Sequence, residues 1–206
     1  MGVIRSSPPA QRPRYSGGTT WSVTQILDAA GVTPDFTGIP PEKLKEKASI
    51  GTEVHGLIES YLRADGTFME LFEQSSDRAH DYFECFMRFF DDCGSIEIIS
   101  LEGQMVTMEY AGTVDFVGVV DGIKVIIDWK TSIEIYPHYR VQLTGYYHLA
   151  KKKLGLEGDD WQLWCVQLSD IGNKKDYRIK KYKPDHALWL GCLAVFNFKL
   201  KEGLWP

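Results

Sequence analysis

The sequence has few of the features that mark secreted or membrane proteins. Its 206 residues contain four cysteines (Cys85, Cys93, Cys165 and Cys192), and these do not have the close spacing of a metal-binding motif. We therefore expect reduced, mostly buried thiols and a cytoplasmic location. No apolar run is long enough to span a membrane and the N-terminus lacks a signal-peptide core, so no membrane association is predicted.

The chain also lacks an excess of basic residues. Its net charge is -5, with 44% hydrophobic and 25% charged residues, which excludes a largely disordered chain and gives no general reason to expect a polyanion as partner. Residues 1–18 are rich in Pro, Ser, Arg and Gly and predict a flexible basic arm. Arg12 and Arg14 in this arm are candidate phosphate contacts, and a solvated tail is the alternative. Residues 19–206 suit a single domain.

The segment YAGTVDFVGVVDGIKVIIDWKTS, residues 110–132, predicts a β-hairpin. Asp121-Gly122 separates two runs rich in Val, Ile and Phe, and both central positions of a type I′ turn need the positive φ that Asp-Gly tolerates. The predicted strands are 111–120 and 123–130, with Val120 paired to Ile123. A bulge at Gly118 would shift this register by one residue.

In the unshifted register, two carboxylates and an ammonium share one face of the hairpin. Asp115 falls opposite Asp128, and Lys130 lies on the same face because side chains alternate along a strand. One interpretation is a surface salt bridge between Lys130 and either aspartate. The strands are apolar on both faces, however, and buried charges are rare unless they are paired or bind a metal. We therefore favour a site for Mg²⁺ or Mn²⁺, which take oxygen ligands.

The rest of the chain alternates between helical and strand patterns. Val54, Ile58 and Tyr61 form an apolar helical stripe, with His55 on an adjacent face. Helices are predicted at 21–31, from Pro41 to about 49, and at 51–62, 78–90, 139–154 and 184–201. Further strands are predicted at 96–101, 104–108, 161–168 and 177–182.

Four short segments, in this order and at these spacings, resemble a known enzyme family. They are GTEVH (51–55), AGTVD (111–115), DWKTS (128–132) and QLTGY (142–146). Together they resemble the PD-(D/E)XK nucleases, in the RecB-type branch that includes phage exonucleases, CRISPR-adaptation nucleases and the mitochondrial genome maintenance exonuclease. The resemblance covers about residues 50–150. It implies an α/β (α+β) fold of the restriction-endonuclease-like type, with a central mixed sheet flanked by helices.

The resemblance implies a metal site built from four groups. His55, Asp115, Asp128 and the main-chain carbonyl of Trp129 correspond to the family's metal ligands. The implied ion is Mg²⁺ or Mn²⁺, and an imidazole among oxygen ligands shifts the preference toward Mn²⁺. Iron–sulfur members of the branch carry a downstream cysteine trio that this sequence lacks, so no iron–sulfur cluster is predicted.

The resemblance also implies the residues that act on the substrate. Lys130 would orient or help deprotonate the attacking water and offset charge in the transition state. Gln142 and Tyr146 match a helix that supports this lysine and the scissile backbone. A glutamate before the AGTVD strand is usual in the family; Glu102 is the first choice and Glu109 the second.

The function expected from this resemblance is a metal-dependent DNA exonuclease in phage or bacterial recombination, replication or repair. The expected partners are free DNA ends, with a helicase or a single-strand annealing protein as a further partner. A basic run of Lys151, Lys152 and Lys153 is a candidate DNA-backbone contact, although such runs are often solvated helix ends. Two alternatives stay open: a structure- or sequence-specific endonuclease, and an inactive module that binds nucleic-acid ends.

Overall fold

The computed structural model describes residues 14–15, 18–171 and 174–204. Arg12, one of the two candidate contacts in the predicted N-terminal arm, lies outside these residues. Arg14 belongs to a two-residue strand β1 (Arg14–Tyr15), which pairs antiparallel with β2 (Gly18–Thr19).

A mixed five-stranded sheet in the order β3-β4-β5-β6-β7 forms the centre of the molecule. Its strands are β3 (Ile96–Val106), β4 (Ala111–Val120), β5 (Ile123–Lys130), β6 (Gln162–Ile171) and β7 (Lys174–Tyr182). Strands β5 and β6 run parallel, whereas the other neighbouring pairs are antiparallel. A parallel pair needs a crossover connection, and helix α5 (His138–Leu154) supplies it. The predicted mixed α/β class is therefore correct.

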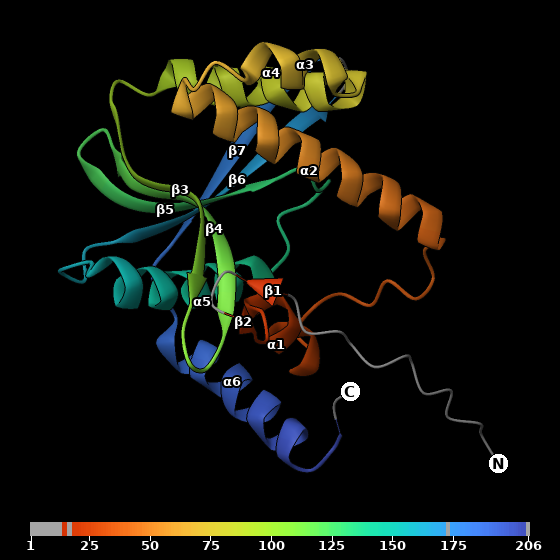
Figure 1. Ribbon diagram of the computed structural model, residues 1–206, viewed down its shortest axis with the longest axis vertical. Coiled ribbons are helices and arrows are strands. Elements are labelled where there is room, and N and C mark those ends of the chain that lie inside the picture. Colours follow the sequence, from red (N-terminus) through yellow and green to blue (C-terminus); the bar gives the residue numbers. More distant parts are fainter. Residues whose placement is uncertain (1–13, 16–17, 172–173, 205–206) are drawn as a thin grey trace.

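Helices cover both faces of this sheet (Figure 1). One face carries α1 (Val23–Ala29), α5 and α6 (His186–Lys201); the other carries α2 (Pro41–Arg63), α3 (Phe68–Gln74) and α4 (Asp77–Asp92). Each face has its own hydrophobic core. Ile126 of β5 packs toward α1, α5 and α6, whereas Ile127 and Trp129 pack toward α2 and α4. Strand β5 is thus buried on both faces, as its apolar sequence predicted.

The predicted hairpin register is confirmed. Strands β4 and β5 pair from Val120↔Ile123 to Phe116↔Ile127, and Asp121 and Gly122 both have positive φ in the turn. The bulge considered at Gly118 lies instead in β3, between Ile98 and Ser100. A Cβ at Gly118 would collide with the Glu97 carbonyl, so the glycine allows the bulged strand to approach without shifting the β4–β5 pairing.

Two predicted interruptions are absent from the structure, and one helix was missed. The helices expected from Pro41 and at 51–62 are one continuous helix α2, because no residue between them breaks the backbone hydrogen bonding. The strands expected at 96–101 and 104–108 are one strand β3. Helix α3 was not predicted; its Phe68 and Phe72 pack on Phe83 of α4, a contact that local periodicity does not reveal.

Two expectations about the whole chain can be compared with the described residues. All four cysteines are free thiols, and Cys85, Cys165 and Cys192 are buried. Within residues 18–171 and 174–204, no helix combines the length and the apolar character that a membrane crossing requires.

Candidate functional site

Three side chains from different elements meet beside the centre of the sheet: His55 of α2, Glu102 of β3 and Asp115 of β4. His55 Nδ1 lies 3.1 Å from Glu102 Oε1 and 3.5 Å from Asp115 Oδ2. One potential ligand atom from each residue falls within 4.8 Å of the others, so the group has the composition and spacing to hold a metal ion.

Helix packing fixes His55 in this group. Val54, Leu57 and Ile58 of α2 are buried against the sheet, and His55 lies on the side of the helix that contacts Glu102 of β3 and Asp115 of β4. The apolar stripe predicted for this helix therefore determines where its one histidine points.

Backbone geometry places Glu102 opposite Asp115. Glu102 lies between the pairs Leu101↔Phe116 and Gly103↔Val114 of the β3–β4 ladder. Its φ is 43°, a left-handed conformation that is uncommon for a residue with a side chain. Such a conformation costs about 1–3 kcal/mol and is found most often at functional sites. Glu109, the second choice from the sequence, is exposed instead and lies 3.9 Å from Lys152.

The side chain of Asp115 continues the contact between β4 and β5 beyond the last pair of the β4–β5 ladder. The last β4–β5 pair is Phe116↔Ile127, one residue short of the predicted Asp115–Asp128 pair. Beyond it, the Trp129 amide donates a hydrogen bond to Asp115 Oδ2 at 2.9 Å. The N–H and C=O of one strand residue lie on the same edge of the strand, so the Trp129 carbonyl also faces the gap between β4 and β5.

Asp128 forms a second part of the site with Lys130. Lys130 Nζ lies 2.6 Å from Asp128 Oδ2, and both side chains are largely buried. The ammonium also lies 4.7 Å from the centre of the Tyr139 ring, a favourable cation–π position. Asp128 is not a member of the three-residue group, so the structure divides the predicted ligands into a His–Glu–Asp group and an Asp–Lys pair.

Helix α5 adds a buried pair of polar side chains to this region. Gln142 Nε2 donates a hydrogen bond to the Tyr146 hydroxyl at 2.8 Å. Burial is the main cause that raises the pKa of Tyr146, and the nearby charge of Asp128 adds to it. Two glycines of the sequence motifs allow this close packing. A Cβ at Gly112 would lie 2.9 Å from Tyr146 Cε1, and one at Gly145 would lie 3.0 Å from Trp189.

The carboxylates govern protonation in the site. Burial disfavours the charged form of His55, but the charge of Asp115 and the hydrogen bond that His55 donates to Glu102 outweigh it and raise the pKa of His55 to about 9. Burial raises the pKa of Asp115 to about 7; His55 opposes this, whereas Asp128 and Glu102 add to it. Burial would lower the pKa of Lys130, but Asp128 raises it well above its ordinary value, so the ammonium form persists.

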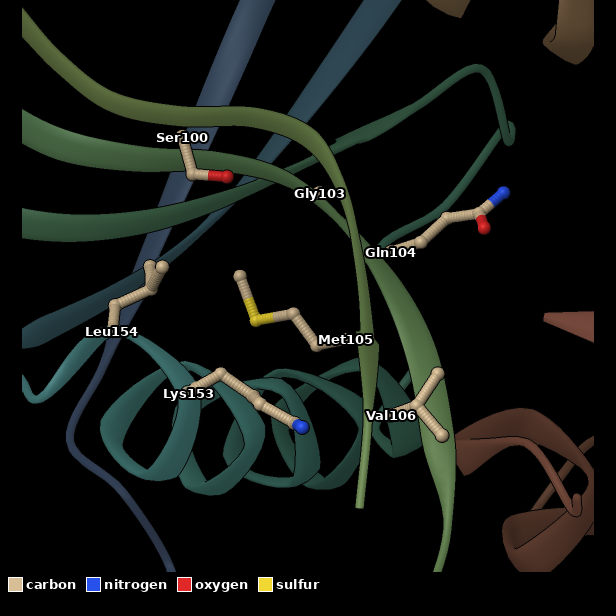
Figure 2. Close-up of a pocket in the computed structure, with 7 residues that line it drawn as sticks. All are labelled: Ser100, Gly103, Gln104, Met105, Val106, Lys153 and Leu154. Atoms are coloured by element: carbon tan, nitrogen blue, oxygen red, sulfur yellow. The ribbon is translucent and has the colours of Figure 1, made fainter. Parts of the chain in front are cut away.

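The lysines proposed as DNA contacts are exposed and lie outside this group. Lys151 is paired with Asp159 at 2.7 Å, and Lys152 lies near Glu109. Lys153 lines a cavity of about 290 Å³ between β3 and the end of α5. Figure 2 shows Met105 lying between the strand and the helix there, while Gln104 points away from the helix. The remaining lining residues are Ser100, Gly103, Val106 and Leu154.

Two neighbours of Lys130 were missed from the sequence. Tyr139 was not distinguished from the other aromatic residues of its helix. Gln167 of β6 pairs with Lys130 in the parallel ladder, is fully buried, and donates a hydrogen bond from Nε2 to the Ser132 carbonyl at 2.6 Å. A lone amide within the apolar run WCVQL was the available signal for Gln167.

No protein-family model matches this chain, and no curated protein matches it. A functional assignment therefore rests on the chemistry of the side chains gathered at the site.

Proposed function

We propose that this chain is a divalent-metal-dependent deoxyribonuclease of the PD-(D/E)XK superfamily, in its RecB-type branch, and that it acts as an exonuclease. The observation that carries the proposal is the meeting of His55, Glu102 and Asp115 beside the Asp128–Lys130 pair. Three of the four sequence motifs supply His55, Asp115 and the Asp128–Lys130 pair, and the fourth supplies Gln142 and Tyr146, whereas Glu102 lies outside the motifs. The order of strands β3, β4 and β5, helix α5 and the parallel strand β6 is consistent with the core that the resemblance implies.

The donor set fits a divalent cation. One imidazole nitrogen and two carboxylate groups suit Mn²⁺, and also Mg²⁺ with water completing its shell. Asp128, whose charge acts on Asp115, and the Trp129 carbonyl would complete the ligands. When bound, the ion would acidify a water molecule and polarise the phosphate.

Lys130 supplies positive charge at a fixed point. Asp128 and Tyr139 hold its ammonium from two sides, so its position needs little rearrangement when a phosphate arrives. Because its pKa is raised, the ammonium acts by stabilising negative charge on the phosphate and not by removing a proton from water.

Tyr146 is a candidate hydrogen-bond donor to the substrate backbone. Its hydroxyl oxygen accepts a hydrogen bond from Gln142, which leaves the hydroxyl proton available to donate elsewhere. The electrostatic energy of the Tyr146 hydroxyl proton is lowest when it points toward the negative charge of Asp128 or of a bound phosphate. Gln142 therefore acts as a positioning residue for Tyr146.

The proposed setting is phage or bacterial DNA recombination, replication or repair, with a free DNA end as substrate. A helicase or a single-strand annealing protein is the proposed partner, since no helicase motif is present in the sequence. Exonuclease action is favoured over the endonuclease alternative by the resemblance to the RecB-type branch.

A cleavage time course tests the proposal. End-labelled linear DNA, single- and double-stranded, is incubated beside closed circular DNA with Mg²⁺, Mn²⁺ or EDTA. The parent is compared with Lys130→Ala and with Lys124→Ala, which removes a lysine of the same strand that pairs with exposed Asp160. We expect metal-dependent loss of linear DNA, abolished by Lys130→Ala and unchanged by Lys124→Ala. Nicked circles would favour an endonuclease. DNA binding without cleavage in every metal would contradict both the exonuclease and the endonuclease hypothesis.

A further inference from the structure

A pair of histidines joins two helices on the opposite side of α5 from the sheet. His148 belongs to α5 and His186 is the first residue of α6, which lies against α5 (Figure 1). His186 Nδ1 lies 3.1 Å from His148 Nε2. The ring centres are 5.0 Å apart and the planes are inclined by 79°, so the two nitrogens approach each other edge to edge.

The surrounding contacts hold both rings in place. The Asp185 amide donates to Thr144 Oγ1 at 3.1 Å, and Asp185 is paired with Arg140 at 3.2 Å, which fixes the start of α6 on α5. The buried Tyr147 ring lies 5.9 Å from each imidazole. A site whose donors are fixed before the ligand arrives binds with a smaller loss of entropy.

The separation of the nitrogens matches two ligands of one transition metal. With the usual Zn–N length, nitrogens at this separation subtend an angle of about 100° at the metal, within the range of tetrahedral and octahedral coordination. Imidazole is the ligand that Zn²⁺, Cu²⁺ and Ni²⁺ prefer, whereas Mg²⁺ takes oxygen.

We propose that His148 and His186 form a Zn²⁺ site that links α5 to α6 and is separate from the His55–Glu102–Asp115 group. Water would complete the coordination around the two imidazole nitrogens.

Without a metal, the same separation of the two nitrogens fits one hydrogen bond between the imidazoles, and the experiment below separates the two cases.

Zinc binding to the untagged, EDTA-treated full chain tests this site. Zn²⁺ is titrated by calorimetry, and the bound metal is counted after equilibrium dialysis. The parent is compared with His148→Gln and His186→Gln. The control is His80→Gln, because His80 stacks on the Phe72 ring and its Nε2 hydrogen-bonds to the Phe72 carbonyl. His186 is exposed, so its replacement should leave the fold intact, which circular dichroism checks.

We expect the parent and His80→Gln to bind one more Zn²⁺ per chain than either His148→Gln or His186→Gln. Zn²⁺ should also raise the thermal midpoint of the parent more than that of these two variants, because the ion links α5 to α6. Equal zinc content in the parent and both variants would overturn the proposal and leave a hydrogen-bonded pair. The outcome does not depend on nuclease activity.

Discussion

The two ends of strand β5 carry ion pairs that differ in burial. At one end, Lys130 lies 2.6 Å from Asp128, with side chains 17% and 2% exposed. At the other end, Lys124 lies 3.1 Å from Asp160, with side chains 39% and 66% exposed. Removing two charges from water is costly, and a buried pair often stabilises a fold no better than apolar residues would. The buried pair, adjoining a His–Glu–Asp group, is therefore better explained by chemistry than by stability.

The largest expected effect is that of Asp115→Asn. Asp115 contacts His55 and accepts a hydrogen bond from the Trp129 amide. An asparagine oxygen can still accept this hydrogen bond, but the substitution removes the negative charge that a metal ion needs. We expect DNA cleavage to fall by about 10³-fold or more and Mn²⁺ binding measured by calorimetry to be lost. A folded Asp115→Asn protein that cleaves DNA at the parent rate would refute the proposed site.

The next effect concerns stability and compares the two ends of β5 directly. Lys130→Met leaves Asp128 buried without its partner, and we expect the free energy of unfolding to fall by about 3 kcal/mol. Adding Asp128→Leu should recover most of this loss, since the pair is then replaced by apolar side chains. Urea denaturation measures all three proteins. If Lys130→Met alone were as stable as the parent, the buried pair would not be held as the structure shows.

Metal binding should release protons from the site. In the metal-free protein the pKa of His55 is raised to about 9 and that of Asp115 to about 7, so at pH 7 the imidazole is charged and the carboxyl is partly protonated. A metal binds the deprotonated forms. Mn²⁺ affinity should therefore rise with pH from 6 to 9, and proton release at pH 7 should exceed about one per ion and decline above pH 9. Calorimetry in buffers of different ionisation enthalpy measures the proton release. Metal binding without any proton release would contradict the assignment of His55 and Asp115 as ligands.

The sequence predicted the elements whose signals are local. The Asp121-Gly122 turn fixes the β4–β5 register by its own conformational preference, and the apolar stripe of α2 fixes the direction of His55. The position of Glu102 depends instead on the bulge between Ile98 and Ser100 and on a left-handed backbone conformation, neither of which residue spacing reveals.

Contacts between distant segments were also beyond sequence reasoning. The burial of Gln167 beside Lys130 follows from the parallel pairing of β5 with β6, which α5 makes possible. The role of Gly112 follows from the close approach of Tyr146 on α5. In both cases the role of the residue could be recognised only after the structure showed which distant residue packs on it.

The smallest expected effect is that of Lys124→Ala at the exposed end of β5. Its partner Asp160 is well solvated, so water and salt screen their attraction and replace it when the lysine is removed. We expect the thermal midpoint and the DNA cleavage rate to match those of the parent within error, at low and at high salt. A clear loss of cleavage with an unchanged midpoint would mean that the DNA path extends along β5 to Lys124. The functional difference between the two lysines would then arise from substrate contact as well as from burial.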